Sequence, residues 1–180
     1  MNTMQTDLLD QCKRGDPAAL ERLVKTYQAD VYRLTLSILD DPNEASDALQ
    51  ETFLAALRAL ENFRGESTLK TWLYSIAINL CRSRLARRRT RARLQHILEI
   101  LQPTALPPEE KAIQNERETD LRQFINTMDE KHRLPLILRY DQNLPIGEIA
   151  ALLRLPVGTV HSRLNSARKR LRAALEEKNS

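Results

Sequence analysis

The sequence is poor in the residues on which several protein classes depend. Its 180 positions contain two cysteines, Cys12 and Cys81, four glycines and 4% aromatic residues. Two distant cysteines without CxxC or His–Cys spacing support neither a disulfide framework nor a zinc site, so we expect reduced thiols and no bound metal. With few aromatic rings, leucine, isoleucine, valine and alanine must fill the core.

Long apolar segments and catalytic patterns are also missing. No apolar run approaches the about 20 residues of a membrane-spanning helix, which argues against membrane insertion. Residues 1–10 lack the basic stretch and following apolar stretch of a signal peptide, so we expect a cytoplasmic protein. Without a catalytic triad or a ligand cluster, we expect neither enzymatic activity nor a cofactor.

Helical periodicity accounts for most of what remains. Apolar residues recur with a period of about 3.6 residues and predict an all-α fold of two small domains. The first, residues 1–93, would hold four helices. They are expected at 7–14, from an Asp16 cap and Pro17 to about 39, from an Asn43 cap to 60, and from a Ser67 cap into an arginine-rich end.

A change in composition separates the second domain from the first. Residues 94–110 contain three prolines and read as a flexible linker. The apolar start of this segment either docks on something or extends the preceding helix. Residues 111–180 form the second domain, with helices expected at 112–128, 130–140 with an interruption at Pro135, 145–153, and 157–176.

The end of the fourth helix carries dense positive charge. After an apolar face with Leu69, Leu73 and Ala77, seven arginines follow without a nearby carboxylate in the sequence: Arg82, Arg84, Arg87, Arg88, Arg89, Arg91 and Arg93. A half-buried helix that continues into such a block suits a polyanion.

The last two helices resemble a helix-turn-helix. We expect Pro156 at the first position of the second helix, with Val157, Val160 and Leu164 facing inward. Small polar side chains near the start of that helix can reach base edges, and later basic ones can meet phosphates. The competing interpretation is a solvated helix face on a small bundle.

Together these signals resemble one known family, the bacterial sigma factors of the extracytoplasmic-function group. Residues 63–79 resemble its promoter-melting segment, and residues 47–54 resemble its polymerase-binding helix. Residues 148–164 resemble its C-terminal helix-turn-helix. The combination, in this order and in so short a chain, is specific, whereas each piece alone is weak.

The resemblance implies partners and contact residues. Core RNA polymerase would contact Asp47, Gln50, Glu51 and Phe53. The −10 promoter DNA would contact Phe63, Arg64, Glu66, Ser67, Asn79, Arg84, Arg87 and Arg88. The −35 DNA would contact Thr159, His161, Ser162, Arg163, Asn165, Ser166 and Lys169. An anti-sigma factor would hold the protein inactive by covering such surfaces.

Two other functions would each explain part of the sequence. A helix-turn-helix regulator that acts without core polymerase would explain the second domain and leave residues 47–54 and 63–79 unused. A membrane-surface protein could use the arginine block, but it leaves the second domain unexplained. Among single residues, we expect Trp72 in the core and His132 on the surface, while Phe63 could pack under its loop or stack on a base.

Overall fold

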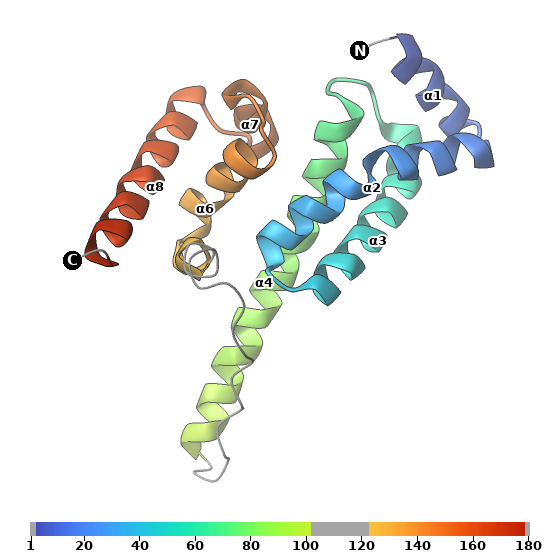
Figure 1. Cartoon of the computed structure of the whole chain (residues 1–180). Coiled ribbons are helices and arrows are strands. Elements are labelled where there is room, and N and C mark those ends of the chain that lie inside the picture. Colours follow the sequence, from blue (N-terminus) through green and yellow to red (C-terminus); the bar gives the residue numbers. More distant parts are fainter. Residues whose placement is uncertain (1–2, 102–122, 179–180) are drawn as a thin grey trace.

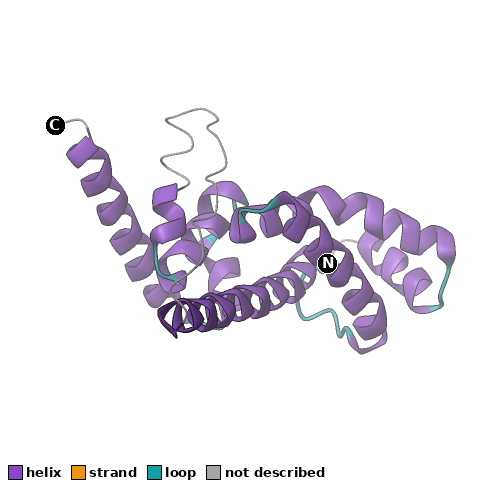
Figure 2. Cartoon of the chain, turned by 90° about the horizontal axis from the view of Figure 1, so that it is seen from below, coloured by secondary structure: helices purple, strands orange, loops and turns teal. Residues whose placement is uncertain are grey.

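The computed structural model describes residues 3–101 and 123–178, and the side chains of 7–94 and 123–176. These ranges contain helices and connecting loops but no strand (Figure 2), which confirms the all-α prediction. None of the described helices is long and apolar enough to cross a membrane. In chain order (Figure 1), the elements are α1 (Thr3–Lys13), α2 (Pro17–Leu39), α3 (Pro42–Ala59), the 3₁₀ turn η1 (Leu60–Asn62), α4 (Leu69–Leu101), α6 (Glu130–Leu136), the π-helical turn η2 (Ile137–Asp141), α7 (Ile146–Leu153) and α8 (Val157–Lys178).

The segment predicted as a linker is helical where it is described. Of the two possibilities for residues 94–101, the structure has the extension, because α4 continues to Leu101. The rest of the predicted linker and most of the helix expected at 112–128 lie outside the described residues. Residues 123–127 are helical, as expected for the end of that helix.

Two of the three predicted helix caps are displaced. Asp16 stands directly before Pro17, and its carboxylate accepts the N–H of Ala18, as predicted for the cap of α2. At α3, Asp41 rather than Asn43 is the cap, because its carboxylate accepts the N–H groups of Asn43 and Glu44. Pro42 then occupies the first helical position, which its fixed φ suits.

The cap of α4 is corrected in the same way. Thr68 Oγ1 accepts from the N–H of Thr71 at 3.1 Å, whereas Ser67 Oγ bonds to the carbonyl of Thr68. A cap must stand directly before the first helical residue, and that residue is Leu69. Ser67 is one position too early.

The first core is formed where α2, α3 and α4 pack together, with α1 against α2. Leu69, Leu73 and Ala77 are fully buried and follow one another at four-residue intervals along α4. They meet Leu23 and Leu34 of α2 in one apolar cluster. This confirms the apolar face predicted for α4, and it leaves the next turns of that helix free to carry arginines.

The second part of the fold contains the predicted interruption at Pro135. Proline has no N–H to continue the helical ladder, and α6 gives way to η2 one residue after Leu136. The N–H of Gln142 donates to the carbonyl of Ile137, five residues back, at 3.1 Å. This wider turn leads the chain into α7.

His132 lies in this part and corrects a prediction. It was expected on the surface, but the structure buries it at the start of α6, where it bonds to Asp129. The hydrogen bond from His132 lowers the pKa of Asp129. Arg170 of α8 lies 3.6 Å from the same carboxylate, so this acid ties α6 to α8.

The two halves of the chain pack against each other, with η2 beside α2 and α7 beside α4, while α8 lies on the far side of α6 and α7 (Figure 1). Between them, the Tyr74 hydroxyl donates to Gln142 Oε1 at 2.7 Å, and Gln142 Nε2 donates to Asp141 Oδ2 at 2.6 Å. Ser37 Oγ of α2 donates to the same Asp141 oxygen at 2.5 Å. Burial raises the pKa of Tyr74, which keeps its hydroxyl protonated as a donor. Hydrogen bonds therefore satisfy buried polar groups across the junction.

Both cysteines are free and buried, and this predicts low reactivity. Burial raises the pKa of Cys81 from 9.0 to about 12, against the opposing effect of Arg84 and Arg133. At pH 8 the raised pKa makes the thiolate fraction of folded Cys81 about 1,000-fold lower than that of a thiol with a pKa of 9.0, and thiolate is the form that reacts. Iodoacetamide labelling, located by peptide mass spectrometry, should modify Cys81 much faster in urea than in native buffer. Equal rates in the two conditions would contradict the expected burial.

Candidate nucleic-acid and partner-binding surfaces

The outer side of α3 carries an acidic stripe with an exposed leucine at its C-terminal end. Asp47, Gln50 and Glu51 are exposed, as expected for a partner surface. Leu54 follows on the same side of the helix and is 53% exposed, which is unusual for leucine in a helix that also contributes to the core. The sequence prediction did not include Leu54 as a contact, although its position seven residues after Asp47 was a signal for a shared face.

Phe53 does not belong to this surface, and its assignment as a polymerase contact is corrected. Its ring is 6% exposed and lies in the core with Ala48 and Ala56. Phe53 stands two residues after Glu51, which turns it about 200° around the helix. An acidic residue and an aromatic residue at this spacing face opposite sides.

The carboxylates of α3 reach the arginines of α4. Arg84 Nη2 lies 2.8 Å from Glu51 Oε1, and Arg84 Nη1 lies 3.9 Å from Asp47 Oδ2. Arg88 lies 3.8 Å from Glu44 and donates to the carbonyl of Leu39 at 3.3 Å. The expectation that the arginine block lacks nearby carboxylates is therefore wrong for the folded chain, because α3 packs along α4 and supplies carboxylates that are distant in the sequence.

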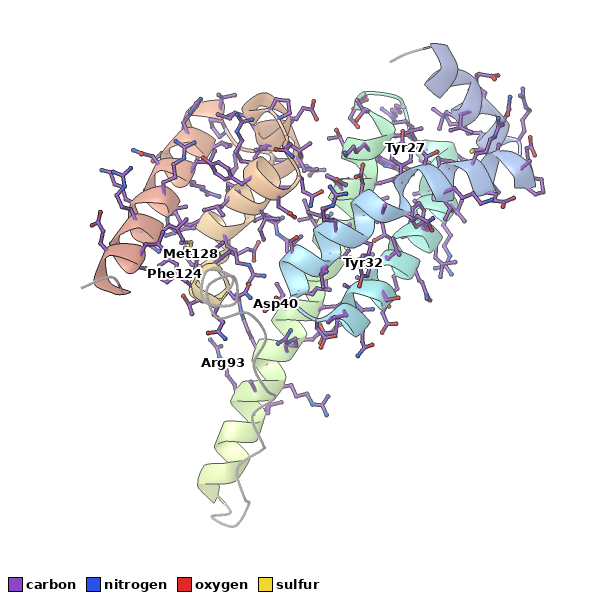
Figure 3. The ribbon with its side chains drawn as sticks, viewed as in Figure 1. Tyr27, Tyr32, Asp40, Arg93, Phe124 and Met128 are labelled. Carbon is purple, nitrogen blue, oxygen red and sulfur yellow. The ribbon has the colours of Figure 1, made fainter. Side chains whose placement is uncertain are left out.

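The remaining arginines of α4 divide into two sets. Arg82 pairs with Glu130 of α6 at 2.6 Å, and Arg89 lines a small cavity beside the same glutamate. Among the described side chains, Arg87, Arg91 and Arg93 are exposed and make no ion pair. The helix carries Arg93 beyond the other helices (Figure 3), so this end of α4 is accessible to a polyanion.

The loop before α4 has a buried floor and an exposed rim. Phe63 is 6% exposed, and its ring centroid lies 4.8 Å from that of Trp72. Phe63 is thus packed under the loop, which corrects its assignment as a DNA contact. Trp72, expected in the core, is half-buried and packs against the core from its edge. The rim presents Arg64 and Glu66, while Ser67 is partly covered. Asn79 is exposed further along α4.

The helix α8 separates its core side from its solvent side as predicted. Val160, Leu164 and Ala167 are buried, whereas His161, Ser162, Asn165 and Lys169 are exposed. Thr159, Arg163 and Ser166 are partly buried on its flanks. All seven predicted −35 residues therefore lie on one helix with at least partial access to solvent.

Helix α8 starts at Val157, as its predicted range has it, but Pro156 is not its first helical residue. Pro156 precedes the helix, and its carbonyl accepts the N–H groups of Thr159 and Val160. Val157, expected inside, is 50% exposed. The turn from α7 is closed by Arg154 in the left-handed region and by the N–H of Leu155, which donates to Ala150 at 2.9 Å. The two helices thus form the predicted helix-turn-helix.

Comparisons with known proteins cover almost the whole chain. Residues 23–91 match the Sigma-70 region 2 family, and residues 118–171 match the Sigma-70 region 4 family. The RNA polymerase sigma-H factor of Pseudomonas aeruginosa is 35% identical over 98% of this chain and 97% of that protein. The ECF RNA polymerase sigma-E factor of Haemophilus influenzae is 33% identical over 90% of each.

Solved structures share the fold. CnrH, in complex with the cytosolic domain of CnrY, superposes with a TM-score of 0.71 at 24% identity, over 96% of this chain and 97% of that chain. The sigma factor RpoE of Bartonella quintana, in complex with the anti-sigma factor NepR, gives a TM-score of 0.66 at 21% identity. That match covers 87% of this chain and 96% of that chain.

Proposed function

The chain belongs to the extracytoplasmic-function (ECF) group of RNA polymerase sigma factors, and we propose which of its surfaces meets each partner during transcription initiation. A sigma factor is a non-enzymatic initiation factor that binds core RNA polymerase and directs it to promoter DNA. Similarity to RNA polymerase sigma-H over 98% of the chain carries this assignment. It replaces the alternative of a regulator that acts without polymerase.

Core RNA polymerase binds the outer side of α3 in this proposal. Asp47, Gln50 and Glu51 supply a polar rim, and Leu54 adds an apolar contact that the partner can cover. Protein interfaces combine apolar area with polar groups, and this stripe offers an exposed leucine next to three polar side chains. Phe53 supports the same surface from inside, because it fixes α3 on the core.

The −10 element binds, as single-stranded DNA, around the loop before α4 and along the exposed part of that helix. Arg64, Glu66 and Ser67 form the rim of the loop, and Asn79 lies on the exposed part of α4. The Phe63–Trp72 pair gives the loop a rigid floor. A base that leaves the stack needs a pocket, and the displaced backbone needs cations such as Arg87.

The −35 element is read in the major groove by α8. His161 and Ser162 point away from the core near the start of α8, where a recognition helix contacts base edges, and Asn165 and Lys169 continue this exposed face along the helix. Thr159, Arg163 and Ser166 flank them and can reach phosphates or edges. Arg168, whose Nε donates to the Tyr140 hydroxyl at 2.6 Å, is held beside this face.

An anti-sigma factor regulates the protein in this proposal, by covering the polymerase-binding or DNA-binding surfaces. Two structures with the same fold are complexes, CnrH with the cytosolic domain of CnrY and the sigma factor RpoE with the anti-sigma factor NepR. Exposed polar faces on α3 and α8 are the surfaces such a partner would need to cover. Because polymerase and promoters are cytoplasmic in bacteria, we place the working protein there.

Transcription in a purified system tests the function. Core RNA polymerase with this chain should produce run-off transcripts from a limited set of sites in a genomic template library, because the chain supplies promoter recognition. Reactions with core enzyme alone and with the chain alone are the controls. Absence of specific transcripts, together with absence of core binding, would overturn the assignment.

A further inference from the structure

The arginine nearest to α3 has a different role from its neighbours. We propose that Arg84 is a positioning residue of the polymerase-binding face, and not a contact to the −10 DNA. This inference rests on the proposed binding of core polymerase by Asp47 and Glu51. It reassigns a residue that the sequence placed with the DNA-binding arginines.

The geometry around Arg84 is that of a two-armed clamp. Its Nη2 approaches Glu51 at 2.8 Å, and its Nη1 approaches Asp47 at 3.9 Å. The two carboxylates stand one helical turn apart on α3, so one planar guanidinium spans both. Lysine, which offers a single charged centre, cannot span them in the same way.

The difference in burial indicates that Arg84 supports the two acids from below and is not itself the contact surface. The side chain of Arg84 is 19% exposed, while those of Asp47 and Glu51 are 67% and 51% exposed. The cation therefore lies beneath the acids, which remain open to a partner. A phosphate would have to compete with Glu51 for the Nη2 group of this guanidinium, whereas a protein bound to α3 meets acids that are already paired.

Ordering of this kind favours binding. Acidic side chains lose rotamer freedom when a partner immobilises them. The ion pairs with Arg84 restrict these side chains before the partner binds, so binding itself costs less conformational entropy. The opposing effect is that Arg84 partly neutralises the acids and weakens long-range attraction. We expect ordering to dominate at physiological ionic strength, because solvent and salt screen exposed charges.

Arg87 is the matched comparison on the same helix. It stands three residues after Arg84, its side chain is exposed, and it makes no ion pair among the described side chains. Arg88 is intermediate, since it pairs with Glu44 at 3.8 Å and caps the carbonyl of Leu39. Arg84 and Arg87 should therefore separate polymerase binding from DNA binding.

The test uses the full chain with Arg84→Gln, Arg84→Lys and Arg87→Gln. Arg84→Gln should lower affinity for core polymerase five- to ten-fold, and Arg84→Lys should restore part of it. Neither change should alter how promoter binding by the holoenzyme depends on salt. Arg87→Gln should leave core affinity unchanged and reduce the slope of log affinity against log salt by about 0.7 to 0.9, the value for one phosphate contact. Thermal melting confirms that each variant is folded.

A double-mutant cycle with Glu51→Gln separates this inference from the proposed function. If Arg84 acts through Glu51, the double variant should lose little more affinity than Glu51→Gln alone. Unchanged or tighter core binding by Arg84→Gln, or losses that simply add, would overturn the positioning role while Glu51→Gln still weakens binding. If Glu51→Gln has no effect either, the proposed polymerase-binding face itself is wrong.

Discussion

The double variant Asp47→Arg with Gln50→Ala is expected to bind core RNA polymerase at least ten-fold more weakly than the natural chain. Asp47 is exposed on α3, so arginine presents the wrong charge to whatever cation meets it. The new arginine also stands beside Arg84 and disturbs its pairing with Glu51. Ten-fold corresponds to about 1.4 kcal/mol, less than the several kcal/mol that like charges across an interface can cost.

Stability should fall only modestly in this variant, because Asp47 and Gln50 are exposed and the ion pair that Asp47 makes with Arg84 is long, at 3.9 Å. Fluorescence titration of labelled chain with core polymerase measures the affinity, and thermal melting reports on the fold. Glu21→Arg with Gln28→Ala makes the same chemical changes at exposed positions of α2 and should keep full affinity. Equal affinity for both double variants would remove Asp47 and Gln50 from the interface.

Ser162→Glu is expected to weaken −35-dependent promoter binding by ten- to a hundred-fold. Ser162 is exposed on α8, opposite the buried Val160 and Leu164. In the major groove a carboxylate there would face bases within the strong negative field of the phosphates, and it would replace a hydroxyl that can donate and accept. Loss of one good base contact and an added repulsion together account for about 1.4 to 2.8 kcal/mol.

The measurement compares holoenzyme binding to a promoter with its −35 element intact and to one with that element scrambled. Ser162→Glu should reduce the preference for the intact promoter, while core polymerase affinity stays unchanged. Gln28→Glu adds the same charge at an exposed position of α2 and should behave as the natural chain does. If Ser162→Glu retained the natural preference, α8 would not be reading the −35 element through this face.

Local patterns were sufficient for the helices and for the family. The spacing of Leu69, Leu73 and Ala77 predicted the buried face of α4, and Asp16 with Pro17 predicted the start of α2. Such signals involve residues within one or two turns, so the order of residues alone carries them. The segments at 47–54, 63–79 and 148–164 identified the family for the same reason, and the comparisons confirm it.

Where several neighbouring residues could cap a helix, the sequence prediction missed the observed cap by one or two positions. Asn43 and Ser67 are good capping residues, but Asp41 and Thr68 stand directly before the first helical residue. Val157, expected inside, is half-exposed at the first residue of α8. These choices depend on the backbone conformation of the junctions, which side-chain preference does not fix.

The sequence by itself determined an all-α ECF sigma factor with a polymerase-binding helix, a promoter-melting segment and a helix-turn-helix. Only the tertiary structure decided that Phe53 and Phe63 are buried, and that Arg84 serves the carboxylates of α3. It also decided that the two halves of the chain meet through Tyr74 and Gln142. The physical reason is that burial and ion pairing depend on residues brought together from distant helices. Helical periodicity says which side of a helix faces inward, but it does not say which partner lies there.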